Sequence, residues 1–143
     1  MGVILVMNVK INSAMQEFVS EADEVLERLT IALSHLEKSE DRSTLIHSIY
    51  RDIHSLKGSA QLFGCHNIGT LAHCMEAVME PIRADRIGLD ITLVDQIYLA
   101  LDAIRLQVNA LRGEGKESAS NANHEIIPRL IEIASHLLGS VHI

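Results

Sequence analysis

The chain has 143 residues, of which 48% are apolar and 22% are charged, and its 12 basic and 19 acidic side chains give a formal net charge of −7. This length is typical of one domain, which buries enough surface to fold without a disulfide or a metal. The acidic balance argues against a nucleic-acid backbone or an anionic membrane surface as the partner, because both require clustered Lys and Arg.

The chain begins with an apolar run at residues 2–7. This run is far shorter than the roughly 20 residues that span a bilayer, and it lacks the basic stretch and cleavage site of a signal peptide. Residues 1–10 are therefore interpreted as a short leader, which packs on the core or on a partner or is an artificial addition. The two cysteines are typical of a reduced, cytoplasmic protein.

Apolar residues then recur at alternating steps of three and four, which predicts four amphipathic helices with seams narrow enough for a bundle. Asp41 or Ser43 is expected to cap the second helix, and Gly64 to end it. Thr92 is expected to cap the fourth. The predicted inward residues are Ile11, Met15, Phe18, Ala22, Val25, Leu29, Ala32 and Leu36 in the first helix, Leu45, Ile49, Ile53, Leu56, Ala60 and Phe63 in the second, Ile68, Leu71, Met75, Val78 and Ile82 in the third, and Val94, Ile97, Leu101, Ile104, Val108 and Leu111 in the fourth.

Residues 112–123 are rich in Gly, Ser, Asn and charge, and they are expected to form a flexible linker. A fifth amphipathic helix is predicted over about residues 124–139, with Pro128 in its first turn, where proline is tolerated. No alternating strand pattern follows residue 10. The expected fold is all-α: an antiparallel up-down-up-down four-helix bundle over about residues 11–111, with an additional C-terminal fifth helix in the same domain, residues 11–143.

The strongest candidates for functional residues lie on the second helix, in the segment HSLKGSAQLFG from His54 to Gly64. Lys57 and Gly58 follow His54 by three and four residues, and Gln61 follows Gly58 by three. These residues share a helix face beside the buried stripe, so His54 should reach solvent. Glycine in a helix interior costs about 1 kcal/mol relative to alanine, which indicates that Gly58 leaves space for another macromolecule beside the histidine. Lys57 places an ammonium near the imidazole, where it attracts an anion such as a phosphoryl group.

The third helix offers His73 and Glu76, three residues apart on one face. If the second and third helices are antiparallel neighbours, Glu76 accepts a hydrogen bond from one ring nitrogen of His54. That bond fixes the tautomer and leaves the other nitrogen as an exposed nucleophile. The carboxylate also stabilises the positive ring that forms when this nitrogen takes a phosphoryl group.

The segment from His54 to Gly64 resembles the signature of histidine-containing phosphotransfer domains, most closely the N-terminal phosphotransfer domain of CheA-type chemotaxis histidine kinases. The resemblance runs from about Ile11 to Leu111 and includes the long acidic first helix. It implies that His54 is the phosphorylated residue. The positions that match the family's surrounding polar network are Lys57, His73 and Glu76, and the docking surface is expected at Gly58, Ser59 and Gln61.

The resemblance further implies a place in a two-component, chemotaxis-like phosphorelay. His54 would accept a phosphoryl group from the ATP-binding catalytic domain of a histidine kinase and donate it to an aspartate of a response-regulator receiver domain. Nothing in the chain resembles a nucleotide-binding domain, and the Gly113 to Lys116 segment is too short for a phosphate-binding loop and lacks the preceding strand. The protein is therefore expected to be a cytoplasmic phosphoryl carrier without a cofactor, monomeric as an isolated domain, with neither a nucleic-acid nor a membrane partner, and part of a histidine kinase if the chain continues.

Two other classes of function stay open. The first is a helical module that docks receiver or kinase domains without carrying phosphate. The second is a metal-binding bundle, suggested by the pairs Cys65-His66 and His73-Cys74, because thiolate and imidazole are common zinc ligands. Adjacent residues on a helix point about 100° apart, which argues against a metal site. The remaining histidines are expected to be incidental surface residues: His35, His47, His124, His136 and His142.

Overall fold

The computed structural model describes the backbone of residues 2–36, 38–89 and 91–141, and the side chains of residues 13–36, 38–89, 91–133 and 135–136. Within these residues it contains helices and no strand. The helices are α1 (Gly2–Leu36), α2 (Arg42–Leu62), α3 (His66–Arg83), α4 (Ile91–Leu111) and α5 (Lys116–Val141). The all-α class predicted from periodicity is confirmed.

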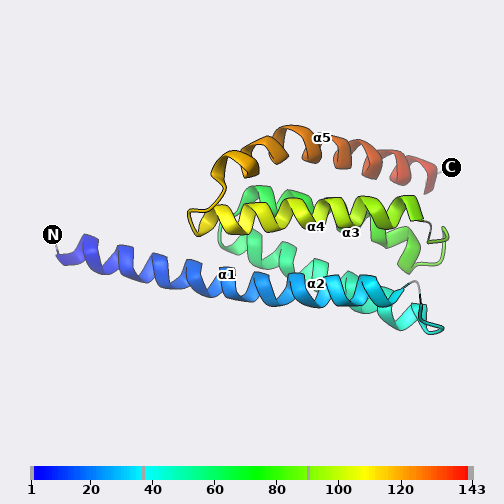
Figure 1. Cartoon of the computed structure of the whole chain (residues 1–143), viewed down its shortest axis with the longest axis horizontal. Helices are drawn as coiled ribbons and strands as arrows, with labels where there is room; N and C mark the ends of the chain where they lie inside the picture. Colours follow the sequence, from blue (N-terminus) through cyan, green and yellow to red (C-terminus); the bar gives the residue numbers. More distant parts are fainter. Residues whose placement is uncertain (1, 37, 90, 142–143) are drawn as a thin grey trace.

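Consecutive helices run in opposite directions along one long axis (Figure 1). Helix α1 packs on α2 and α4, and α3 also packs on α2 and α4, so α1 to α4 close into a four-helix bundle. Helix α5 lies against α3 and α4 on the outside of this bundle. The up-down-up-down bundle with an added fifth helix is therefore as predicted, and it makes α2 and α3 direct antiparallel neighbours.

One continuous core joins the inward faces of the helices, and the predicted stripes supply most of it. Phe18, Leu29, Ile53 and Leu71 are among its largest fully buried side chains. Met15, Ala32, Leu45 and Phe63, which were also predicted inward, are partly buried and pack against this core. The prediction is wrong for Leu111, which is 39% exposed, and the side chain of Ile11 lies outside the described residues.

The ends of α2 follow from two local signals. The Asp41 side chain accepts a hydrogen bond from the backbone N–H of Thr44 at 3.4 Å and one from its hydroxyl at 2.8 Å, so Asp41 is the N-cap and Ser43 is not. At the other end Gly64 adopts a φ of 71°, a left-handed conformation that glycine takes without strain and that stops the helix. Thr92 lies inside α4 and does not precede it.

The predicted boundary of the leader at residue 10 is not a break in secondary structure. Residues 2–10 belong to α1, which runs unbroken from Gly2 to Leu36. No proline interrupts this stretch, and adding residues to an existing helix is easier than starting a new one. The N-terminal part of α1 consequently extends beyond the ends of the other helices (Figure 1).

The predicted linker at residues 112–123 is wrong from Lys116 onward. Gly113 and Gly115 have positive φ values and make a short turn, after which α5 begins at Lys116. Ala119 and Ala122 are buried, and Gln107 of α4 donates a hydrogen bond to the Ala119 carbonyl at 2.9 Å. Small residues at three-residue spacing thus form a helical face against α4, although the composition is typical of a loop.

Because α5 begins earlier than predicted, Pro128 lies in its interior instead of its first turn. Proline has no N–H to donate to the preceding turn, and its ring displaces the carbonyl there, which bends a helix. Helix α5 accordingly follows a curved path over α3 and α4 (Figure 1).

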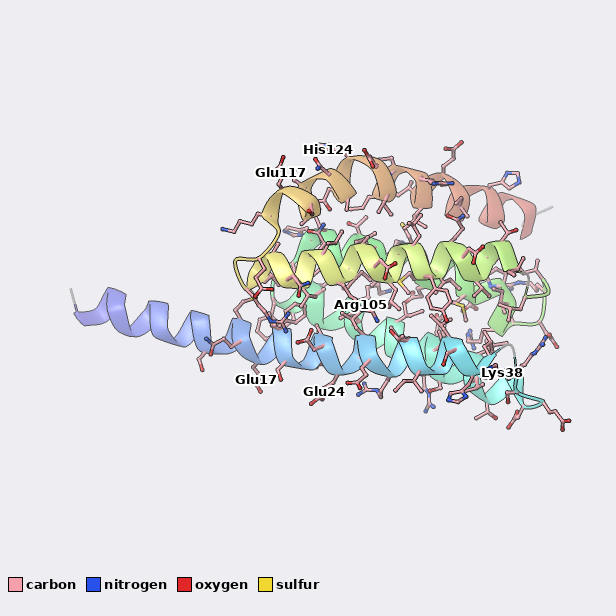
Figure 2. All side chains as sticks on the ribbon, in the orientation of Figure 1. Glu17, Glu24, Lys38, Arg105, Glu117 and His124 are labelled. Atoms are coloured by element: carbon pink, nitrogen blue, oxygen red, sulfur yellow. The ribbon has the colours of Figure 1, made fainter. Side chains whose placement is uncertain are left out.

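Polar side chains are distributed unevenly around α1. Figure 2 shows Glu17 and Glu24 pointing away from α4 and α5, whereas Arg105 lies between α4 and α1. Arg105 contacts Thr30 of α1 and pairs with Asp102 at 3.1 Å. The outer side of α1 is therefore acidic.

No helix in the described part of the chain is both long and apolar enough to cross a membrane.

Candidate functional site

The candidate site lies on the seam between α2 and α3, where three of the residues predicted from the sequence meet. His54 Nδ1 is 2.8 Å from Glu76 Oε2, and Lys57 Nζ is 2.9 Å from Glu76 Oε1. His54 and Lys57 are one turn apart on α2, and Glu76 is on the facing side of α3. One carboxylate therefore contacts both the imidazole and the ammonium. The contact between His54 and Glu76 is the one that the antiparallel arrangement of α2 and α3 predicted.

The three side chains differ sharply in exposure. The side chain of His54 is 62% exposed, whereas those of Lys57 and Glu76 are 17% and 15% exposed. The second ring nitrogen of His54, Nε2, has no hydrogen-bond partner among the described residues. The site thus presents one nitrogen of an exposed imidazole to solvent above a largely buried ion pair.

The electrostatics of Glu76 determine which ring nitrogen carries the proton. Burial alone would raise the pKa of Glu76, but the hydrogen bonds and charges of Lys57 and His54 outweigh it and lower the pKa. Glu76 is therefore ionised at neutral pH and can only accept hydrogen bonds. Nδ1 of the neutral His54 ring must then hold the proton, which leaves a lone pair on Nε2.

The lowered pKa of Glu76 predicts a particular loss of stability in acid. A carboxyl whose pKa is lower in the folded state stabilises the fold above its unfolded-state pKa, and this contribution is lost as the pH falls through the folded-state value. Its ordinary pKa is 4.5, so the loss is expected below that pH. Urea unfolding between neutral pH and about pH 3 should show a steeper loss of stability for the wild-type protein than for Glu76→Gln. Equal slopes for the two proteins would contradict the lowered pKa.

The other predicted site residues are placed less closely around His54. His73 is exposed on α3, one turn before Glu76, and none of the hydrogen bonds or ion pairs found in the described residues involves it. Ser59 is half-buried and donates a hydrogen bond to Glu21 Oε1 of α1 at 3.1 Å. Gly58 and Gln61 are exposed. The ammonium of Lys57 forms an ion pair with the Glu76 carboxylate, so Lys57 helps to fix the position of Glu76.

Two groups of residues near the site were missed from the sequence. Leu62, at the end of α2, is 83% exposed, which is unusual for a large apolar side chain. Tyr50, one turn before His54, has its ring stacked near the imidazole, and Arg83 of α3 lies over the Tyr50 ring. The four-residue spacing between Tyr50 and His54 was the available signal, because such residues are neighbours on a helix face.

The cysteine and histidine pairs considered as metal ligands do not converge. In the described part of the chain, no group of three or more His, Cys, Asp or Glu side chains is arranged to hold a metal ion. Burial raises the pKa of both thiols, Cys65 and Cys74, which disfavours the thiolate that binds zinc. The structure therefore offers no support for the metal-binding alternative.

The fold and the site together define a class: a helical bundle with one exposed histidine whose tautomer is held by a neighbouring carboxylate. A comparison with protein-family models matches residues 13–114 to the Hpt domain. The chain belongs to the Hpt domain family.

Known relatives agree with this membership. The chain is 30% identical over 102 residues to the chemotaxis protein CheA of Listeria monocytogenes, covering 71% of this chain and 16% of the relative. It is 28% identical over 117 residues to CheA of Bacillus subtilis, covering 80% of this chain and 17% of the relative. The chain thus spans less than a fifth of the length of these relatives.

Two solved structures are similar in fold. The CheA phosphotransferase domain from Thermotoga maritima has a TM-score of 0.67 and 30% sequence identity, covering 70% of this chain and 95% of that domain. The phosphorylated P1 domain of CheA3 from R. sphaeroides, solved in complex with CheY6, has a TM-score of 0.71 and 18% identity, covering 88% of this chain and 98% of that one. The bundle is therefore the fold of CheA phosphotransfer domains.

Proposed function

We propose that this protein is a histidine phosphotransfer domain of a chemotaxis-like two-component phosphorelay, and that His54 carries the phosphoryl group. The observation that carries the proposal is the hydrogen bond between His54 Nδ1 and Glu76, on an imidazole that is 62% exposed. It directs the lone pair of Nε2 to solvent, where a second protein can reach it. Membership of the Hpt domain family supports the same role.

The proposed cycle has two steps. In the first, the Nε2 lone pair attacks the γ-phosphorus of ATP held by a kinase catalytic domain, an N–P bond forms, and the P–O bond to ADP breaks. The ring keeps its Nδ1 proton and gains positive charge, which the Glu76 carboxylate stabilises. In the second, a carboxylate oxygen of a receiver aspartate attacks the phosphorus, the N–P bond breaks, and Nε2 regains its lone pair.

Lys57 and His73 have supporting roles in the proposal. Lys57 holds Glu76 in place through its 2.9 Å ion pair, so that the carboxylate stays oriented toward the imidazole. Its positive charge also reduces the repulsion between the phosphoryl group and the acidic side chains of the protein. His73, exposed on the same side of α3 one turn from Glu76, is a candidate hydrogen-bond donor to the phosphoryl oxygens.

The docking surface is the exposed face of α2 around His54. A Cβ atom added to Gly58 would meet nothing within 4 Å, so packing inside the domain does not require glycine there. Gln61 and the 83% exposed Leu62 continue this face one turn further. We assign it to the receiver domain and the kinase domain, which must both bring a reactive group to His54.

Gly58→Ala should therefore stabilise the domain while impairing its transfer reactions. We expect a gain of about 0.5–1 kcal/mol in the free energy of unfolding, because alanine is the better helix former and has open space here. The added methyl group should raise the KM for the receiver domain. Urea unfolding and receiver titration of the phosphorylated protein measure the two effects, with Ala110→Gly on α4 as a helix-propensity control of opposite sign. A stabilised variant with an unchanged KM would remove Gly58 from the docking surface.

The proposal includes the partners and the setting. The donor is the ATP-binding catalytic domain of a histidine kinase, and the acceptor is a response-regulator receiver domain. The phosphorylated P1 domain of CheA3 was solved in complex with CheY6, which supports a receiver as partner. The proposal also sets the protein in the cytoplasm, where ATP is available, and takes the isolated domain to be a monomer.

The decisive experiment is a transfer assay with the full chain. A CheA-type catalytic fragment and γ-labelled ATP should label the protein, and the label should be labile in acid and stable in base, as expected for an N–P bond. Addition of a CheY-type receiver should then remove the label from this protein. Binding of the receiver without any labelling would favour the alternative, a docking module that carries no phosphate.

A further inference from the structure

A ladder of side chains beside the site continues along the α2–α3 seam. On α3, Glu76, Glu80 and Arg83 recur at four- and three-residue spacing and face α2. On α2, His54 and Tyr50 are one turn apart and face α3 in the opposite chain direction. Glu76 therefore meets His54, while Glu80 and Arg83 meet Tyr50.

The Tyr50 ring lies almost parallel to the imidazole. The two ring centroids are 6.3 Å apart, and the ring planes differ by 12°. The hydrogen bond to Glu76 restrains one edge of the imidazole, at Nδ1. A parallel aromatic ring on the same helix face restrains the tilt of the imidazole plane, which that hydrogen bond alone leaves free.

Tyr50 is itself held by charged residues of α3. The Arg83 guanidinium carbon lies 4.5 Å from the centroid of the Tyr50 ring, within the range of a cation–π contact. Arg83 forms a bidentate pair with Glu80, at 2.8 Å from Nη2 to Oε1 and 3.1 Å from Nε to Oε2. Burial and the negative charges of Glu76 and Glu80 raise the pKa of Tyr50, so its hydroxyl stays protonated.

We propose that Tyr50, clamped by Glu80 and Arg83, is a positioning residue that orients the His54 ring for phosphoryl transfer. This inference rests on the proposed function of His54. In-line attack on phosphorus requires the Nε2 lone pair to point along one direction, and a small misalignment slows such a reaction. Glu76 sets the tautomer, and the Tyr50 ring sets the plane of the imidazole.

The test compares three variants of the full chain with a matched control. Tyr50→Leu removes the ring, Tyr50→Phe keeps the ring without the hydroxyl, and Arg83→Met removes the cation at a side chain that is 33% exposed. Tyr98→Leu makes the same change at the other tyrosine of the chain, on α4, which packs on α1, α3 and α5 and not on α2. Two readouts are used: the kinetics of phosphorylation by a CheA-type catalytic fragment, and the ¹⁵N chemical shifts of the His54 ring.

The expected result is specific to the ring. Tyr50→Leu should lower kcat by about three- to tenfold with little change in KM, the scale of one aromatic contact. Tyr50→Phe should restore most of the rate, and Arg83→Met should give a smaller decrease. The His54 ring signals of Tyr50→Leu should broaden or shift, whereas Tyr98→Leu should match the wild-type protein in both readouts.

The outcomes separate this inference from the proposed function. Wild-type kcat and wild-type ring signals in Tyr50→Leu would overturn the positioning role. If Tyr50→Leu does not fold, wild-type values for both readouts in Arg83→Met, which changes a partly exposed side chain, would overturn it instead. If the wild-type protein itself is never phosphorylated, the proposed function fails, and the ring signals still decide whether Tyr50 orients His54.

Discussion

Replacing His54 with glutamine should abolish phosphorylation of the protein. Glutamine is similar in length and can hydrogen-bond to Glu76, but its amide nitrogen has no available lone pair with which to attack phosphorus. Because the His54 side chain is 62% exposed, the variant should keep its stability within about 0.5 kcal/mol of the wild-type value. Labelling with a CheA-type catalytic fragment and γ-labelled ATP measures the first effect, and urea unfolding measures the second.

His47→Gln is the matched control for this experiment. His47 is an exposed histidine on the same helix, two turns before His54, and it takes no part in the pair with Glu76. Its variant should be labelled like the wild-type protein. Labelling of His54→Gln at the wild-type rate would show that the phosphoryl group resides on a different residue.

Replacing Glu76 with glutamine should slow phosphorylation without abolishing it. Glutamine keeps the size of the side chain but loses the negative charge, so it neither selects the Nδ1–H tautomer nor stabilises the positive ring. A decrease in kcat of about a hundredfold is expected, the lower end of what a group that assists proton placement contributes. The loss also leaves the Lys57 ammonium, 17% exposed, without its carboxylate, so the variant should be less stable at neutral pH.

Glu125→Gln provides the control for the change in net charge. Glu125 is exposed on α5, away from the α2–α3 seam, and its variant removes one negative charge from the protein without touching the site. Kinetics of both variants with the same kinase fragment separate the local effect from a general electrostatic one. A wild-type kcat for Glu76→Gln would mean that the hydrogen bond to His54 has no part in catalysis.

The sequence by itself determined the helices and the chemistry of the exposed histidine. Steps of three and four residues record which side of each helix is apolar, and burial of Ile53, Leu56 and Ala60 necessarily turns His54 toward the margin of the bundle. The same period placed Glu76 on the facing side of the next helix. These features depend on local geometry, which each segment carries in its own residues.

Composition misled the prediction where it was used in place of periodicity. Residues 116–123 contain Ser and Asn, which favour loops, yet Ala119 and Ala122 turn one side of this stretch into a packing surface for α4. Burial of that surface in the bundle outweighs the weak local preferences of the polar residues.

Only the tertiary structure decided how the side chains on neighbouring helices combine. The sequence placed Lys57 beside His54 and Ser59 on the docking surface, but only the fold shows that Lys57 pairs with Glu76 and that Ser59 donates a hydrogen bond to Glu21 of α1. It also brought Arg83 over Tyr50, across 33 residues of chain, beside the imidazole of His54. Such contacts depend on the relative rotation and register of packed helices, which follow from how all the side chains fit together in the core and not from the pattern of any single helix.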